Sequence, residues 1–121
     1  MFTIKVENIF TAQHQLIMPD GQAEPLHSHD WIVRTAVSAA KLDKTGLALD
    51  FNLLKEKLEK ITAPLNNAKL QDLHPFHGVN PSAENVAKYI FTKLEPLLPA
   101  NVKLKYVEVC EATGCWAKFS R

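Results

Sequence analysis

The chain has 121 residues, a formal net charge of +1, 46% hydrophobic residues and 22% charged residues. This length suits one domain, residues 1 to 121, with a single core, and the composition excludes a disordered, fibrous or membrane-spanning chain. The balanced charge offers no basic surface to nucleic acid or to an anionic membrane, and the first residues lack the long apolar core of a leader, so we expect a cytoplasmic protein with neither partner.

Two long strands are predicted in the first third of the chain. Residues 2 to 14 alternate as a strand that breaks near Glu7 and Asn8. After a loop, residues 26 to 42 predict a second strand, and residues 43 to 46 a turn.

Two amphipathic helices are predicted in the middle of the chain. Asp50 is suited to cap a helix whose apolar residues keep helical spacing to Leu65, and Ser82 is suited to cap a second helix that ends before Pro99. Between them, residues 66 to 80 contain positions before proline, which disfavour helix, so we expect a long loop there.

The last third predicts a hairpin of residues 102 to 111 and 116 to 120. The order strand, strand, helix, helix, strand, strand predicts an α+β fold, with a four-stranded antiparallel sheet and both helices on one face. We expect Phe10, Trp31 and Val33 on the face that the helices leave uncovered. This face would expose a large apolar patch in a monomer, so we expect the chain to oligomerise through its sheet.

Three histidines are the most informative residues of the sequence. His27 and His29 are two apart on the second strand and therefore share a face, and His14 ends the first strand. A third imidazole from a paired strand would complete a cup for a metal ion. Three histidines without a fourth protein ligand are typical of a catalytic zinc site with an open position. The residues alone favour this zinc site no more than they favour half-solvated surface histidines.

Five short motifs extend over essentially the whole chain. They are Phe10-Thr-Ala-Gln-His14, Leu26-His-Ser-His29, Leu49-Asp-Phe51, Val79-Asn-Pro-Ser-Ala-Glu-Asn85 and Val107-Glu-Val-Cys-Glu111. With these motifs in this order, the chain resembles the family of 6-pyruvoyltetrahydropterin synthase and 6-carboxytetrahydropterin synthase. The resemblance implies the tunnelling fold, in which subunits join their sheets into a barrel-like trimer. It further implies a homohexamer, a dimer of trimers, with active sites at subunit interfaces.

The resemblance also implies how the site is used. It assigns a Zn2+ ion to His14, His27 and His29, where the metal polarises the side-chain hydroxyls of a reduced pterin, and it assigns Glu111 to the pterin ring. A carboxylate can accept two parallel hydrogen bonds from an amino-pyrimidinone edge, so the role given to Glu111 is physically sensible. The expected partner is a small, pterin-like molecule.

The proton-handling residues that are usual in the family are absent from this chain. The family's cysteine, four residues before the first histidine of the pair, corresponds to Ala23, and its Asp-His pair after the first helix corresponds to Asn66 and Asn67. Asparagine does not titrate near neutral pH and cannot relay a proton as histidine can. The usual acid-base route cannot operate with these side chains.

Three residues are candidates to replace them. Glu24 lies three residues before His27. A branch of the family has a Glu-x-x-His arrangement in place of the cysteine and cleaves the pterin side chain, so Glu24 is the leading candidate base. His74 and His77 lie in the same loop as the lost pair and could supply an imidazole from a neighbouring subunit, although solvent-facing loop histidines are the simpler interpretation.

Two functions of different classes follow from these residues. The first is zinc-dependent, lyase-type chemistry on the side chain of a reduced pterin, as in a pterin synthase. The alternative is a non-catalytic, zinc-containing homologue that binds a pterin or a purine. A purely structural interaction protein would leave the histidines and Glu111 without a role. The side chain of Glu24 discriminates, since one directed at the metal site favours an enzyme and one directed to solvent favours a binder.

Overall fold

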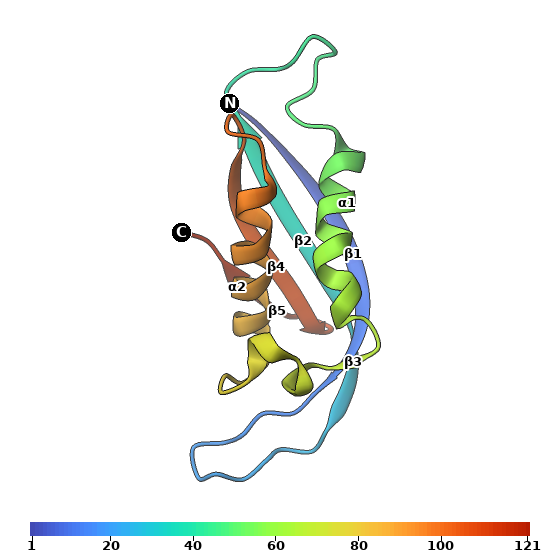
Figure 1. Cartoon of the computed structure of the whole chain (residues 1–121), viewed down its shortest axis with the longest axis vertical. Coiled ribbons are helices and arrows are strands. Elements are labelled where there is room, and N and C mark those ends of the chain that lie inside the picture. The colour runs from blue at the N-terminus through green and yellow to red at the C-terminus, as the bar shows by residue number, and fades with distance from the viewer.

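The structure, a computed structural model, describes residues 1–121 and contains a five-stranded sheet with two helices on one face (Figure 1). The strands are β1 (Phe2–His14), β2 (His27–Ala39), β3 (Ala68–Lys69), β4 (Lys103–Ala112) and β5 (Cys115–Phe119). The α-helices are α1 (Phe51–Thr62) and α2 (Ala83–Leu94), and short 3-10 turns are η1 (Ala63–Leu65), η2 (Leu70–Asp72), η3 (His74–Phe76) and η4 (Glu95–Leu97). The order of strands across the sheet is β3-β1-β2-β4-β5.

The sheet is mixed, which corrects the prediction of four antiparallel strands. The additional strand is β3, whose residues Ala68 and Lys69 pair in parallel with Ala12 and Gln13 of β1. All other neighbours in the sheet are antiparallel. A strand of two residues has no alternation that a sequence can display, and so this segment reads as a loop. The α+β class and the two helices are as predicted.

Strand β1 runs without interruption through Glu7 and Asn8, so the predicted break is wrong. Every residue of β1 pairs with a residue of β2 in one continuous register. Glu7 binds Arg34 on β2, with 2.7 Å between Oε1 and Nε, and Asn8 Nδ2 donates to Thr62 Oγ1 at 2.5 Å. These partners offset the low strand propensity of glutamate and asparagine.

Both helices begin at the predicted caps and end earlier than predicted. The side chains of Asp50 and Ser82 accept backbone N–H groups of the first turns. Each helix then passes into a 3-10 turn that contains a proline, Pro64 after α1 and Pro96 after α2. Proline has no N–H to donate to the preceding turn, so the regular helix stops there. No helix of the structure has the length and apolar character that crossing a bilayer requires.

The core lies between the two helices and one face of the sheet. The rings of Phe10 and Trp31 are stacked on this face with centroids 5.8 Å apart, and Val33 is fully buried beside them. These residues pack with the buried faces of α1 and α2 in one cluster. The prediction that they lie on an uncovered face is therefore wrong, because both helices cover that face (Figure 1).

The opposite face of the sheet carries a row of apolar residues across four strands. Pairing places Ile9, Ile32, Cys110 and Trp116 next to one another in this row. Ile9 is 58% exposed and Trp116 is 40% exposed, with the Arg34 guanidinium 4.4 Å from a ring centroid of Trp116. This row is an apolar strip on the face of the sheet that the helices leave open.

Candidate metal centre

Three histidines gather at one end of the sheet because of the register between β1 and β2. His14, the last residue of β1, lies directly opposite His27, the first residue of β2, and Ala12 lies opposite His29. Directly opposed residues of an antiparallel pair point to the same face, so all three rings lie on the face that the helices cover. Their ring centroids are between 5.0 and 5.4 Å apart.

The ring of His14 is fully buried and is oriented by a backbone carbonyl. Its Nδ1 lies 2.8 Å from the carbonyl oxygen of Pro81. Because a carbonyl oxygen only accepts hydrogen bonds, Nδ1 carries the hydrogen, and Nε2 of the neutral ring presents a lone pair. This Nε2 atom is buried and no hydrogen-bond donor reaches it. The sequence does not reveal the role of Pro81, since it depends on a contact between distant segments.

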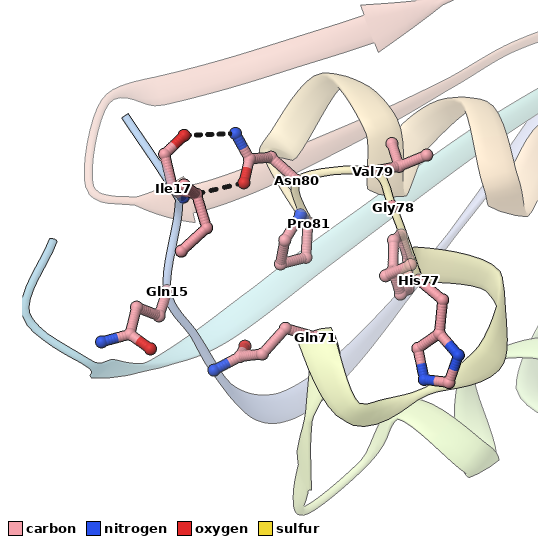
Figure 2. Close-up of a pocket in the computed structure, with 9 residues that line it drawn as sticks. Gln15, Ile17, Gln71, His77, Gly78, Val79, Asn80 and Pro81 are labelled. Atoms are coloured by element: carbon pink, nitrogen blue, oxygen red, sulfur yellow. Dashed lines mark hydrogen bonds between the residues drawn. The ribbon is translucent and has the colours of Figure 1, made fainter. Parts of the chain in front are cut away.

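Pro81 is held in place by its neighbours in the chain. The carboxamide of Asn80 binds both the N–H and the carbonyl of Ile17, at 2.8 and 2.9 Å (Figure 2). Asn85 on α2 donates from Nδ2 to the carbonyl of Asn80 at 2.9 Å. The loop after β1 and the start of α2 are thus tied together around His14.

A carboxylate completes the group of histidines. Oε1 of Glu111, on β4, lies 2.5 Å from Nε2 of His14 and 3.4 Å from Nε2 of His29. One ligand atom from each of His14, His27, His29 and Glu111 lies within 4.8 Å of the others. We call these four residues the His-Glu cluster. The structure therefore differs from the expectation of three histidines without a fourth protein ligand.

The His-Glu cluster fits a divalent metal ion such as zinc. Nε2 of His14 and the carboxylate oxygen of Glu111 face each other, and two lone pairs at this distance need a proton or a metal ion between them. Imidazoles and a carboxylate are ligands that zinc accepts. Burial lowers the pKa of His29, although the nearby Glu111 carboxylate opposes this shift. A lowered pKa favours the neutral imidazole, which is the form that binds metal.

The side chain of Glu24 is directed at this cluster. Its Oε1 lies 3.2 Å from Nε2 of His27 and accepts the N–H of Leu16, also at 3.2 Å. Only 22% of the Glu24 side chain is exposed. The structure thus places the Glu24 carboxylate against His27, and its role as a base stays a prediction.

His74 and His77 do not join the His-Glu cluster of their own chain. Both residues are exposed, and their ring centroids are 5.7 Å apart. Figure 2 shows the His77 ring directed away from Gln15 and Ile17. A role for either histidine in the site of a neighbouring subunit stays a prediction.

Asn66 and Asn67 bind the edge of the sheet. Oδ1 of Asn66 accepts the N–H of Thr11 at 3.0 Å, and the N–H of Asn67 donates to the carbonyl of Thr11 at 2.6 Å. Asn67 has a positive φ of 61°, a conformation that asparagine adopts more readily than most residues. These two residues connect α1 to β3, and neither side chain belongs to the His-Glu cluster.

An open pocket of about 590 Å³ lies beside the cluster. It is lined by Gln15, Ile17, Gln71 and residues 76 to 81, and so includes Pro81, whose carbonyl binds His14 (Figure 2). Its polar side chains are carboxamides and one histidine, with no acidic residue among them. The pocket is therefore free of acidic side chains and adjoins the residue that binds His14.

Comparison with known proteins points to one family. Residues 3–121 match the family model described as 6-pyruvoyl tetrahydropterin synthase. The chain is 31% identical over 120 residues to the 6-carboxy-5,6,7,8-tetrahydropterin synthase of Synechocystis sp., covering 94% of this chain and 92% of that protein. It is 30% identical over 88 residues to the dihydroneopterin monophosphate aldolase of Pyrococcus furiosus, covering 73% and 72%. The fold is similar to the Caenorhabditis elegans 6-pyruvoyl tetrahydropterin synthase, with a TM-score of 0.82 at 19% identity, covering 99% of this chain and 95% of that chain.

Proposed function

The chain belongs to the 6-pyruvoyl tetrahydropterin synthase family, and from this we propose that it is a zinc-dependent protein that acts on the side chain of a reduced pterin. The observation that carries the proposal is the His-Glu cluster with Glu24 at its rim. The two similar proteins are named as a tetrahydropterin synthase and a dihydroneopterin monophosphate aldolase, and both names refer to a pterin. A pterin is therefore the ligand class that these similarities support.

His14, His27 and His29 would hold the zinc ion. A bound zinc ion supplies Lewis-acid polarisation of ligand oxygens, which requires neither a cysteine nor an Asp-His pair. The bond from Nδ1 of His14 to the carbonyl of Pro81 orients the ring so that Nε2 is the atom that faces the other ligands.

Glu24 is our candidate for the catalytic base. Its carboxylate lies at the rim of the cluster, within 3.2 Å of His27, where it could reach a hydroxyl of the pterin side chain. In aldol-type cleavage, a carboxylate removes the hydroxyl proton, the hydroxyl carbon becomes a carbonyl as the adjacent carbon–carbon bond breaks, and the electron pair passes into the C=N bond of the dihydropterin ring. The same proton can then return to the carbon next to the ring. We therefore propose side-chain cleavage, a lyase-type reaction, with His74 and His77 of a neighbouring subunit as the remaining candidates for proton transfer.

A non-catalytic pterin- or purine-binding protein is the second candidate function. The observation in its favour is that Asn66 and Asn67 hold the sheet edge through Thr11 and offer no titrating group. Pterins and guanine-type purines present the same amino-pyrimidinone edge to a carboxylate such as Glu111. Turnover of a pterin by the zinc-loaded protein would favour the enzyme, and binding without turnover would favour the non-catalytic protein.

Replacing Glu111 by glutamine should weaken pterin binding by about 1.5–3 kcal/mol, the scale of hydrogen bonds to a charged group. The amide cannot accept two parallel hydrogen bonds as the carboxylate does. Isothermal calorimetry with the stable pterin neopterin and zinc-saturated protein measures the loss. Glu108→Gln is the matched control, because it removes the same charge from the opposite face of β4. Equal affinity of wild-type protein and Glu111→Gln would contradict the role given to Glu111.

We propose that the protein is a cytoplasmic homohexamer, a dimer of trimers, joined through the apolar row on the open face of the sheet. Sedimentation velocity should show a hexamer, or a trimer as its stable half. Ile9→Glu should shift the distribution toward smaller species, because it places a charge within this row. Phe51→Glu, at an exposed apolar position on α1, is the control and should leave assembly unchanged. A stable monomer of the wild-type protein at micromolar concentration would contradict the proposal.

A further inference from the structure

We propose that Glu111 is the fourth ligand of the metal in the ligand-free protein, and that it leaves the metal when a pterin binds. The inference rests on the proposed function, because it takes the zinc centre and the pterin ligand as its premises. It gives Glu111 two roles that exclude each other, and it makes recognition of the pterin ring the event that opens the metal.

The position of the carboxylate oxygen is the first argument. Oε1 of Glu111 lies between Nε2 of His14 and Nε2 of His29, at 2.5 and 3.4 Å. The contact with His14 has the length of a hydrogen bond, so the separation from His29 is the informative one. A metal ion bound by both Oε1 of Glu111 and Nε2 of His29 accounts for that separation. Two ligands of a tetrahedral zinc ion are about 3.3 Å apart, which is close to the separation from His29.

The attachment of Glu111 to the sheet is the second argument. Regular pairing between β2 and β4 ends at Ile32 and Cys110, and pairing between β4 and β5 is irregular from Cys110 to Ala112. Glu111 therefore lies at a bulge, beyond the last regular pair, and 27% of its side chain is exposed. His14, in contrast, is fully buried and held by Pro81. Of these two ligands, Glu111 is the one that can leave without breaking the sheet.

The chemistry of the two roles is the third argument. Binding an amino-pyrimidinone edge requires both carboxylate oxygens as acceptors, one for each N–H group. In this structure Oε1 of Glu111 contacts His14 and His29 and is not free to accept a hydrogen bond from a pterin ring. Docking of the ring thus withdraws Oε1 and leaves three histidines with an open position, the arrangement of a catalytic zinc site. A ligand without this edge would leave Glu111 in place and the metal closed.

The test begins with the metal alone. Co2+, which reports its coordination through its visible absorption, is bound to wild-type protein, Glu111→Gln and Glu108→Gln, and its affinity is measured by competition with a chelator. Glu111→Gln should bind Co2+ at least about 10-fold more weakly, the scale seen when metal-site partners are lost, and with a changed spectrum. Glu108→Gln should match the wild-type protein. A wild-type spectrum and affinity in Glu111→Gln would overturn the proposal.

Addition of neopterin tests the release of Glu111. The Co2+ spectrum of the wild-type protein should change on saturation with neopterin. Glycerol, which has three hydroxyls but no ring, is the control and should leave the spectrum unchanged. A spectrum that stays constant while calorimetry records neopterin binding would overturn the release of Glu111. If no pterin binds, both the proposed function and the release of Glu111 from the metal are overturned. The Co2+ measurements on Glu111→Gln and Glu108→Gln still decide whether Glu111 is a metal ligand.

Discussion

Replacing His27 by alanine should remove most of the zinc from the protein. The wild-type chain should hold about one zinc ion per subunit when purified without chelator. His27→Ala deletes one of three imidazoles, while the partial exposure of this ring keeps the change from opening a cavity in the core. Elemental analysis after dialysis measures the zinc content. Because protons compete with metal for imidazole nitrogen, zinc should also be released from wild-type protein as the pH falls.

Two further variants make this result specific. His74→Ala removes the same side chain outside the cluster and should keep the full zinc content. His14→Ala should also lose zinc, but the ring of His14 packs against Trp31 at 4.9 Å between centroids, so loss of fold would accompany the change. Full zinc content in His27→Ala, or wild-type protein without stoichiometric metal, would contradict the proposed centre.

Dihydroneopterin triphosphate should not be converted to 6-pyruvoyl- or 6-carboxytetrahydropterin at ordinary enzymatic rates. The residues at the usual proton-handling positions are Ala23, Asn66 and Asn67, and none of them transfers protons near neutral pH. Cleavage of the pterin side chain should appear instead when dihydroneopterin or its phosphates are supplied. In Glu24→Gln this cleavage should fall by about 10²–10⁴-fold, the usual contribution of a general base. Chromatography of the products measures both reactions.

The zinc content of Glu24→Gln must be determined alongside its activity, because Glu24 also contacts His27. Loss of cleavage with zinc retained assigns the proton transfer to Glu24. Cleavage that persists in Glu24→Gln and disappears in His74→Ala or His77→Ala would move the role of base to those histidines. Binding of pterin without any turnover would favour the non-catalytic alternative, and rapid formation of the usual synthase products would refute the account of the missing residues.

The orientation of the histidines within each strand could be predicted from the sequence because it is local, whereas the meeting of His14 with His27 and His29 depends on the register between β1 and β2. Alternation along a strand places His27 and His29 on one face, and it places His14 on the same face of β1 as Phe10. The caps Asp50 and Ser82 are equally local, because an N-cap binds the backbone two or three residues ahead.

Strand β3, the face covered by the helices and the place of Glu111 depend on contacts between segments that are far apart in the sequence. β3 forms where Asn66 and Asn67 bind Thr11 and the next two residues pair with β1, and nothing in the sequence around residue 68 signals a strand. The face covered by the helices cannot be inferred from alternation, which shows that Phe10 and Trp31 share a face but not which face is covered. Glu111 is far from the histidines in sequence, so its place in the cluster emerges only once β4 is placed beside β2.

The most direct test of a zinc-dependent pterin site is a calorimetric titration of neopterin into the same protein with and without zinc. Our account predicts saturable binding of about one pterin per subunit by the zinc-loaded protein, and binding weakened at least about 10-fold after zinc removal, because the hydroxyls of the side chain then lose their partner. Readdition of zinc should restore the affinity. No binding by the zinc-loaded protein, or equal affinity with and without zinc, would contradict it.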